Sequence, residues 1–456
     1  MKKDKIVIIG AGLSGTLLAI TMAQRGYQVA LYEKRDDMRK VTMSAGRSIN
    51  LALSPRGMLG LDLAGIRPEI LEQCIPMRGR MIHPHGGSSF FQSYSGREGE
   101  AINSVSRGGL NIALLNKAES FPNIEMYFNH TCTHAVLEKG IAHFKHEKTG
   151  FTVEVKGDIL IGTDGSGSAL RKSMMDKTAD LLFNYSQNFL SHGYKELSIQ
   201  PTAEGGFKLD KNALHIWPRG SFMIIALPNM DGSFTVTMFH PYEGPYGFNH
   251  MNSREEVAAF FQNFYPELIP YMPDYVDEYF NNPTGNLGTV KCYPWQTYGK
   301  TLLMGDAAHA IVPFYGQGMN ASFEDVRVFN ELIDTIGDGD WAGLFNEFQK
   351  QRAVNTNAIA DLAIDNFYEM RDRVDDADFM LKRKIETDLE FTYPDYYSKY
   401  SLVTFRPDIP YSRAMHQGRA QDELLLNWCK GGQPELTKSE MHAQLMDLSK
   451  KFENGN

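Results

Sequence analysis

The sequence has few cysteines, no long apolar run and no excess of positive charge. Its four cysteines, at positions 74, 132, 292 and 429, form no C-x-x-C pair, which argues against a disulfide framework and predicts reduced thiols in the cytoplasm. The longest apolar runs, such as "FMIIAL" at 222–227, are far shorter than the ~20 residues of a membrane helix, and no secretory signal fits the N-terminus. A net charge of −9 argues against nucleic acid or an anionic membrane surface as the main partner. We therefore expect a soluble, cytoplasmic protein of several domains.

What the chain does contain is a strand, a glycine turn, a helix and a second strand at its start, over residues 5–35. Strand signals dominate from about 185 to 290, where three strands follow one another between turns that contain glycine. From about 345 the pattern is mostly helical, interrupted by "YYSKYSLVTF" at 396–405. The predicted fold class is α/β, with a discontinuous Rossmann-like nucleotide domain, an inserted β-sheet domain and a helical C-terminal region.

The glycine turn has the dinucleotide fingerprint Gly10-x-Gly12-x-x-Gly15, which follows a strand and opens a helix, and Leu13 within it is a further predicted cofactor contact. Gly10 permits the turn, Gly12 lets the backbone approach a pyrophosphate, and Gly15 lets the helix pack on the strand. Glu33 ends the second strand, where a carboxylate accepts hydrogen bonds from ribose hydroxyls and repels the 2′-phosphate of NADP. The motif alone does not distinguish FAD from NAD.

Two further motifs favour FAD. "GTDGSGSALR" at 162–171 places Asp164 at a strand end, and "GDAAH" at 305–309 places Asp306 at another. Together with Arg107 in "SVSRGGLN", this combination resembles the class A flavoprotein aromatic hydroxylases, which bind one FAD and use NAD(P)H. The resemblance implies that Asp306 contacts the ribityl region and that Asp164 and Arg107 lie near FAD.

Within that class, six segments look like the kynurenine 3-monooxygenase family: "RSINLALSPRG", "IPMRGRMIH", "HGYKEL", "NALHIWPRG", "HAIVPFYGQGMNASFED" and "YSLVTF". The resemblance implies NADPH-dependent hydroxylation of L-kynurenine by O2 to 3-hydroxy-L-kynurenine, through a flavin C4a-hydroperoxide, in tryptophan degradation. Membrane-bound members carry an apolar C-terminal anchor, whereas this chain ends in the polar "LMDLSKKFENGN", as expected of a soluble bacterial-type member that is a monomer or homodimer. We place the FAD-binding domain at 1–75, 100–180 and 285–345, the β-rich substrate domain at 76–99 and 181–284, and the helical region that closes the active site at 346–456.

Arg80 is the first candidate for binding the substrate. On residue pattern alone a surface salt bridge is slightly favoured over bidentate binding of a carboxylate. The resemblance reverses this order, because the matching arginine of the family binds the substrate carboxylate with a tyrosine partner that matches Tyr94.

Asn366 is the second candidate, because it lies in a helical stripe with Ile359, Leu362, Met370 and Val374. A buried amide needs a hydrogen-bond partner, and bonding between helices is the simpler explanation. The resemblance instead makes Asn366 and Tyr400 polar contacts of the substrate. It gives the aromatic ring apolar walls from Leu214, Met223, Ile225, Leu227, Phe239, Phe314 and Met370.

The stretch 305–320 contains Asp306 and His309, a pair also found in hydrolases, but no serine stands in G-x-S-x-G to be the nucleophile. We expect His309 to be structural and no residue to act as catalytic acid or base, since the flavin carries the chemistry. The loop before the helix that begins near residue 318 would bring N–H groups to the flavin. The remaining predicted cofactor contacts are Ala52, Gly316, Gly318, Met319 and Asn320.

Three alternatives stay open at this stage. A related hydroxylase of another aromatic acid would lack the set Arg80, Tyr94, Asn366 and Tyr400, which suits an α-amino acid. A carrier without turnover need not keep all three glycine motifs, and a flavin halogenase would need a W-x-W-x-I-P segment, which is missing.

His130, Cys132 and His134 could share a strand face, but a surface without metal is favoured, so that we expect no metal site.

Overall fold

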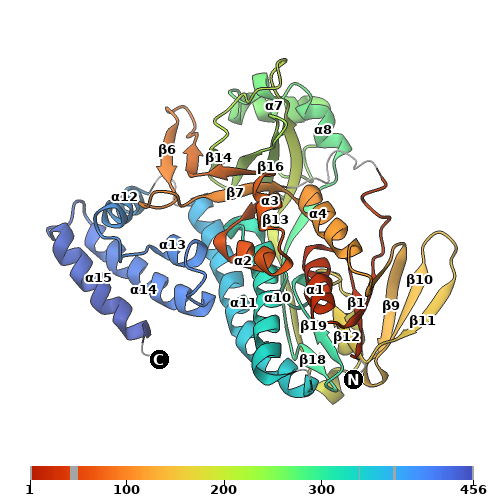
Figure 1. The fold of residues 1–456 in the computed structure, drawn as a ribbon. Helices are drawn as coiled ribbons and strands as arrows, with labels where there is room; N and C mark the ends of the chain where they lie inside the picture. The colour runs from red at the N-terminus through yellow and green to blue at the C-terminus, as the bar shows by residue number, and fades with distance from the viewer. Residues whose placement is uncertain (1–2, 42–49, 338, 373–375, 454–456) are drawn as a thin grey trace. The chain divides into compact units, whose positions relative to one another are not determined.

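The computed structural model describes residues 3–41, 50–337, 339–372 and 376–453 (Figure 1). They divide into two compact units, each assembled from three stretches of chain. Unit 1 comprises 1–73, 106–188 and 288–360, and unit 2 comprises 74–105, 189–287 and 361–456. The division of the chain into three domains stays a prediction, and we describe each unit by itself.

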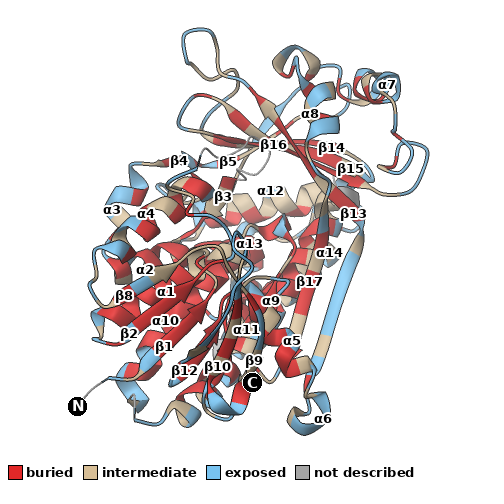
Figure 2. Cartoon of the chain, turned by 90° about the vertical axis from the view of Figure 1, so that its right-hand side faces the viewer, coloured by how far each residue is buried: buried red, intermediate tan, exposed pale blue. Residues whose placement is uncertain are grey.

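Unit 1 is built on a six-stranded sheet in the order β18-β19-β12-β1-β2-β8. Five strands run parallel, and β18 pairs antiparallel with β19. The strands are β1 (Lys5–Ile9), β2 (Gln28–Tyr32), β8 (Ile124–Tyr127), β12 (Ile159–Gly162), β18 (Gln296–Thr297) and β19 (Thr301–Leu303). Strands buried on both faces need continuous apolar sequence, as in "KIVII" and "ILIG", and Figure 2 shows β1 and β12 coloured as buried.

Helices cover this sheet. Helix α1 (Leu13–Gln24) packs against α4 (Arg107–Glu119), α2 (Pro55–Ala64) and α10 (Gly318–Ile336). A second, antiparallel sheet consists of β9 (His130–Val136), β10 (Ile141–His146) and β11 (Thr152–Lys156). The remaining elements of unit 1 are β3 (Asn50–Leu53), α3 (Arg67–Leu71), α5 (Ala169–Met175), α6 (Thr178–Leu181), α9 (Asp306–His309) and the first part of α11 (Trp341–Asp372).

Unit 2 contains most of a seven-stranded, mostly antiparallel sheet whose strands follow in the order β17-β13-β16-β15-β14-β5-β6. The strands are β5 (Gly79–Ile82), β6 (Phe90–Ser93), β13 (Asn184–Ile199, which begins in unit 1), β14 (Ala213–Arg219), β15 (Phe222–Pro228) and β16 (Phe234–Pro241). β4 (Cys74–Met77) pairs antiparallel with β7 (Ile102–Ser106), and β17 (Gly285–Tyr293) leads back to unit 1. The two strands predicted in 78–95 and the three in 212–240 are confirmed.

One face of the large sheet packs against α7 (Arg254–Phe264) and α8 (Tyr275–Asn281) through Trp217, Ile224, Val236, Phe260 and Phe261. The expectation that strands dominate from 185 to 290 is therefore wrong for residues 254–281. A signal was present in the sequence, because Ser253 and Glu256 form a capping box at the start of α7.

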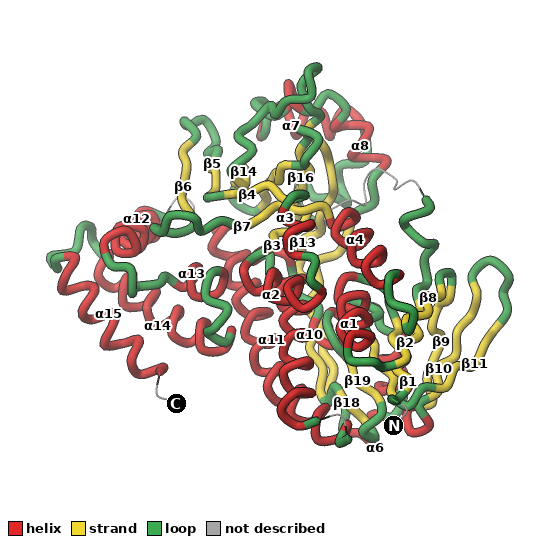
Figure 3. The backbone as a smooth tube through the Cα atoms, viewed as in Figure 1, coloured by secondary structure: helices red, strands yellow, loops and turns green. Residues whose placement is uncertain are grey.

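The C-terminal part of unit 2 is helical, as predicted, with α12 (Ala377–Thr392), α13 (Lys399–Thr404), α14 (Tyr411–Cys429) and α15 (Lys438–Glu453) (Figure 3). The predicted interruption at 396–405 is wrong for α13, which Ser398 caps by accepting a hydrogen bond from the Ser401 N–H. Among the residues described, none belongs to a helix with the length and apolar character needed to cross a membrane.

Candidate active site

The glycine turn after β1 is shaped by three glycines with different surroundings. Gly10 has a φ of +105°, and a Cβ there would come within 2.5 Å of the Thr163 carbonyl oxygen. A Cβ on Gly15 would collide with the Gly10 carbonyl, so that only glycine lets α1 approach the turn so closely. Gly12 has an ordinary φ of −74°, and no described atom lies within 4 Å of where its Cβ would be. The fold therefore needs Gly10 and Gly15, whereas Gly12 leaves space above the turn.

Glu33 follows β2 and is tied to this turn. Its Oε2 accepts a hydrogen bond of 3.0 Å from the Ala11 N–H, and its Oε1 accepts one of 2.7 Å from Arg35 Nε. Burial opposes ionisation, but the hydrogen bonds from Arg35 and Ala11 hold the pKa of Glu33 below its ordinary value. The side chain is thus an anion fixed at the turn, and its oxygens still have lone pairs for further donors.

Asp164 lies beside the turn, where a Cβ on Gly10 would come within 2.8 Å of its Cα. Its Oδ2 accepts hydrogen bonds from the Ala169 and Leu170 N–H groups, while its buried Oδ1 has no partner among the described residues. Burial raises the pKa of Asp164 above its ordinary value. Arg171, the last residue of the 162–171 motif, is not among the predicted site residues. Arg171 is buried, and its Nη1 donates to the Ala307 carbonyl at 2.7 Å. This hydrogen bond connects the 162–171 motif to the "GDAAH" segment at 305–309.

The pair Asp306 and His309 separates into two environments. Asp306 is exposed at the start of α9, directly after Gly305. His309 is buried, and its Nε2 lies 2.5 Å from Asp325 Oδ2, which also accepts from the Gly305 N–H. Asp325 is held in turn by Arg352 Nε at 2.7 Å. His309 therefore has a structural role, in agreement with the sequence analysis.

Asn320 fixes the loop that precedes α10. Its Nδ2 donates to the Ala52 carbonyl at 2.8 Å and to the Gly316 carbonyl at 2.9 Å, and its Oδ1 accepts from the Ser54 N–H. Gly316 has a φ of +66°, and a Cβ there would approach Ala52 Cβ to 2.9 Å. Two segments distant in sequence are thus locked together at the N-terminus of α10, which begins at Gly318 and continues through Met319.

The predicted cofactor residues of unit 1 fit a dinucleotide in three respects. First, the space beside Gly12 is open. Second, the side chains of Asp306 and Arg107 are exposed. Third, two buried oxygens, Asp164 Oδ1 and Ser14 Oγ, have no hydrogen-bond partner among the described residues. Open space, oxygen acceptors and a cationic side chain are what a pyrophosphate and its sugar hydroxyls require.

In unit 2, the structure brings Arg80, Tyr94 and Tyr400 together from three distant parts of the chain. The Arg80 guanidinium carbon lies 4.8 Å from the centre of the Tyr400 ring and 5.6 Å from that of Tyr94. The two rings stack with centres 5.3 Å apart. Arg80 Nε is buried without a hydrogen-bond partner among the described residues. A buried cationic donor of this kind is suited to an anionic ligand.

Both tyrosines are buried, and burial is the main reason that their pKa values are raised, against the opposing effect of Arg80. Each phenol is therefore protonated at neutral pH and carries an O–H group that can donate a hydrogen bond.

The sheet of unit 2 supplies an apolar face beside Arg80. Leu214 is directly opposite Arg80 in the pairing of β14 with β5, and Met223 is opposite Phe239 in the pairing of β15 with β16. Residues directly opposite each other point to the same face, and alternate residues of one strand do too. Since Ile225 pairs with Ile216, two residues after Leu214, the face away from α7 and α8 carries the apolar residues Leu214, Met223, Ile225, Leu227 and Phe239.

The remaining predicted substrate contacts belong to other elements of the chain. Asn366 is buried on α11, and its Nδ2 lies 3.4 Å from Met370 Sδ, so these two residues are neighbours. Phe314 belongs to unit 1 and is buried there. Val374, the last member of the predicted stripe, lies outside the described residues.

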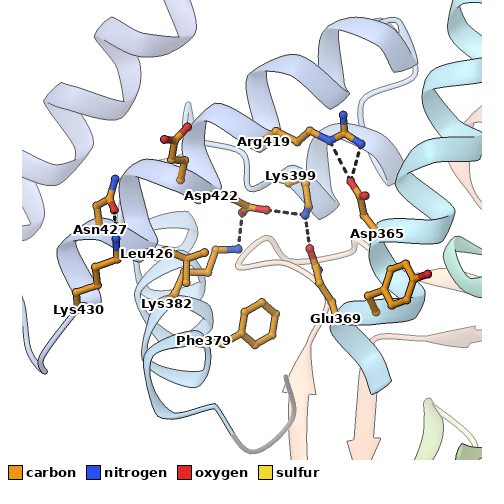
Figure 4. Close-up of a pocket in the computed structure, with 12 residues that line it drawn as sticks. Asp365, Glu369, Phe379, Lys382, Lys399, Arg419, Asp422, Leu426, Asn427 and Lys430 are labelled. Atoms are coloured by element: carbon orange, nitrogen blue, oxygen red, sulfur yellow. Dashed lines mark hydrogen bonds and ion pairs between the residues drawn. The ribbon is translucent and has the colours of Figure 1, made fainter. Parts of the chain in front are cut away.

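A separate pocket of about 600 Å³ lies among the C-terminal helices. Figure 4 shows Lys382 and Lys399 pointing toward Asp422, with Nζ–O distances of 2.5 Å, and Lys399 also reaching Glu369 at 2.5 Å. Cations and anions balance in this cluster, so it offers no net charge to an ionic ligand. We assign it to holding α12, α13 and α14 against the end of α11.

Comparison with known proteins defines the class first. The model of a family described as an FAD binding domain matches residues 3–209 and 286–360, most of the chain. In fold, the chain is similar to 2-methyl-3-hydroxypyridine-5-carboxylic acid oxygenase, with a TM-score of 0.66 at 18% identity, over 89% of this chain and 97% of that one. The α/β fold with an FAD-binding domain and a helical C-terminal region is confirmed.

Closer relatives define the family. The kynurenine 3-monooxygenase of Myxococcus xanthus (strain DK1622) is 43% identical over 432 residues, which cover 94% of this chain and 92% of that protein. That of Dictyostelium discoideum is 43% identical over 438 residues, covering 93% of each. The chain belongs to the kynurenine 3-monooxygenase family of proteins with this FAD binding domain.

Proposed function

We propose that this protein is an FAD-dependent monooxygenase that hydroxylates L-kynurenine to 3-hydroxy-L-kynurenine with NADPH and O2. The observation that carries the proposal is the group of Arg80, Tyr94 and Tyr400 beside an apolar sheet face in unit 2. A cation and two phenols at the edge of an apolar surface suit a substrate with a carboxylate and an aromatic ring. The family of the chain supports kynurenine as that substrate.

FAD is held by unit 1. Gly10, Gly12, Leu13 and Gly15 form the turn for the pyrophosphate, and Glu33 accepts hydrogen bonds from the ribose. The other contacts are Ala52, Arg107, Asp164, Asp306, Gly316, Gly318, Met319 and Asn320. Bound FAD supplies the redox chemistry, since it accepts a hydride from NADPH and activates O2.

The residues of unit 2 orient the substrate. Arg80 pairs with the carboxylate while Tyr94 and Tyr400 donate hydrogen bonds to it, and Asn366 is a further polar contact. Leu214, Met223, Ile225, Leu227, Phe239 and Met370 contact the aromatic ring and exclude water.

No side chain needs to act as a strong base, because the aromatic amine of kynurenine already donates electrons to the carbon that is hydroxylated. Correct placement of that carbon is the main task of the protein. The N-terminus of α10 at Gly318 would favour negative charge on a bound flavin through its backbone N–H groups and its dipole.

The proposal includes a cytoplasmic location and small-molecule partners only. All four cysteines are free and buried, which supports a reducing environment.

The purified protein should be yellow with bound FAD, and L-kynurenine should stimulate its oxidation of NADPH. Mass spectrometry should find one added oxygen in the product, and NMR should place it at ring position 3. Protein that takes up no FAD, or that oxidises NADPH without forming hydroxylated kynurenine, would contradict the proposal. Faster turnover of another aromatic acid would reassign the substrate within the same class.

Replacing Gly12 by valine should weaken FAD binding by about 100-fold or more, because the new side chain occupies the space needed by the pyrophosphate and prevents its backbone hydrogen bonds. The apoprotein should keep its free energy of unfolding, since φ at Gly12 suits any residue and no described atom lies within 4 Å of its Cβ position. Flavin fluorescence titration measures the first effect and urea unfolding the second. Gly15→Ala is the matched control, because there the added carbon collides with the Gly10 carbonyl and should destabilise the apoprotein itself.

A further inference from the structure

The two tyrosines beside Arg80 come from separate segments that must be held in register. Tyr94 follows the short strand β6, and Tyr400 is the second residue of the short helix α13. Neither element is long enough to fix a phenol on its own, yet the two rings stack in parallel, with an angle of 12° between their planes. A group that binds both segments would set the spacing of the two hydroxyls.

Glu390, in the last turn of α12, is such a group. Its side chain is 2% exposed. Its Oε2 accepts a hydrogen bond of 3.2 Å from the N–H of Gly96, two residues after Tyr94. Its Oε1 accepts one of 2.8 Å from the N–H of Ser398, two residues before Tyr400. One carboxylate thus connects the loop that carries the first tyrosine to the start of the helix that carries the second.

The backbone around Gly96 shows that this connection is close. A Cβ on Gly96 would come within 2.5 Å of the Phe391 backbone nitrogen and within 2.6 Å of the Glu390 carbonyl carbon. The loop after β6 therefore lies directly on the end of α12. The backbones are so close that a side chain at position 96 would collide with α12.

Arg97 balances the buried charge and strengthens the same connection. Its Nη1 lies 3.7 Å from Glu390 Oε1, and its Nη2 donates to the carbonyls of Tyr396 and Pro394, in the segment that leads to α13. Its guanidinium also lies 3.6 Å from the centre of the Tyr397 ring. The loop of Tyr94 and the segment before Tyr400 are thus joined by a paired carboxylate and guanidinium.

We propose that Glu390 is a positioning residue for the substrate carboxylate: it holds Tyr94 and Tyr400 at the spacing that lets both phenols bind the anion paired with Arg80. This inference rests on the proposed function, because it assumes a substrate whose carboxylate meets these three side chains. Glu390 itself does not touch the substrate.

Glutamine at position 390 tests this role with little change in shape. An amide has one acceptor oxygen where a carboxylate has two, so glutamine can satisfy the N–H of Gly96 or that of Ser398, but presents its own N–H to the other. One of the two tyrosine segments should then lose its anchor. The substitution changes only the hydrogen bonds to the backbone N–H groups of Gly96 and Ser398. The apolar sheet face that holds the aromatic ring should therefore be unaffected.

The experiment compares two ligands on the FAD-loaded protein without NADPH, by isothermal titration calorimetry. L-Kynurenine carries the α-carboxylate, and kynuramine is the same molecule without it. Glu390→Gln should weaken L-kynurenine binding about tenfold, the loss expected when one or two hydrogen bonds are weakened, and leave kynuramine binding within about twofold. Asp388→Asn removes a charge from the same turn of α12, where it pairs with Lys438, and should change neither affinity.

Equal weakening of both ligands by Glu390→Gln would show a general structural role and overturn the proposal, as would unchanged binding of both. If Glu390→Gln does not fold or bind FAD, Glu390→Asp is measured in the same way, because it keeps the charge but is too short to reach both N–H groups. Failure of the unaltered protein to bind and hydroxylate L-kynurenine would instead contradict the proposed function. If the unaltered protein binds and hydroxylates L-kynurenine and Glu390→Gln binds L-kynurenine with the same affinity, only the inference about Glu390 would be contradicted.

Discussion

Replacing Arg80 by methionine should raise the KM for L-kynurenine by about 100-fold or more, since a bidentate, charge-assisted pair is lost and a carboxylate is left without a cation. The stem of methionine keeps most of the packing against the Tyr94 and Tyr400 rings, so the loss should come from the charge and its donors. FAD content should remain normal, because Arg80 lies in unit 2 and the glycine turn in unit 1. Steady-state oxidation of NADPH over a wide range of L-kynurenine concentration measures the effect.

The control for Arg80→Met is Arg78→Met, two residues earlier, where the side chain is exposed. Arg78→Met should leave KM unchanged, and Arg80→Lys should recover only part of the affinity, because an ammonium lacks the planar fork of donors. Kynuramine should be bound equally by the unaltered protein and by Arg80→Met. A KM for L-kynurenine that stays within threefold in Arg80→Met would contradict the assignment of the carboxylate site.

The strands and the glycine turn could be predicted from local sequence because local physics determines them. Apolar runs bounded by glycine indicate buried parallel strands, and Gly10 and Gly15 are glycines because a Cβ would meet backbone atoms. Helix α7 could also have been predicted, since its capping box is a local pattern. The helical content of 396–405 was harder to see, because α13 is short and depends on the cap at Ser398.

The candidate substrate site could not be derived from local sequence. Arg80 and Tyr400 meet through the pairing of β5 with β14 and the packing of the C-terminal helices. The residues next to Arg80 and Tyr400 in the sequence form no local pattern that predicts this contact. Arg80 and Tyr400 are predicted as substrate contacts only through the resemblance to the kynurenine 3-monooxygenase family. Glu390 had no such signal, since its partner Gly96 is 294 positions away, and a glutamate near a helix end looks like any solvated side chain.

Replacing Asp325 by asparagine should lower the free energy of unfolding by about 3–5 kcal/mol at pH 7, the scale for breaking a buried ion pair. Asp325 is fully buried, and its two oxygens bind Arg352 at 2.7 Å and His309 at 2.5 Å. An asparagine has one acceptor oxygen in place of two, and it leaves Arg352 with Glu324 as its remaining carboxylate partner in this network. Urea unfolding of the full chain measures the loss, with Asp334→Asn as control. Asp334 is on the same helix but pairs with Arg25 near the surface, where an ion pair contributes little.

The pH dependence separates the lost charge from a simple packing defect. Burial opposes ionisation of Asp325, but His309 and Arg352 hold its pKa below the ordinary value of 3.8. A carboxyl with a depressed folded-state pKa contributes stability above the unfolded-state value, and that contribution is lost as the pH falls through the folded-state pKa. The difference in unfolding free energy between the unaltered protein and Asp325→Asn should therefore be full at neutral pH and shrink below about pH 3.8. A difference that is constant down to pH 3, or no larger than that of Asp334→Asn, would show that the ionised carboxylate is not what holds the turn of Gly305 against α10.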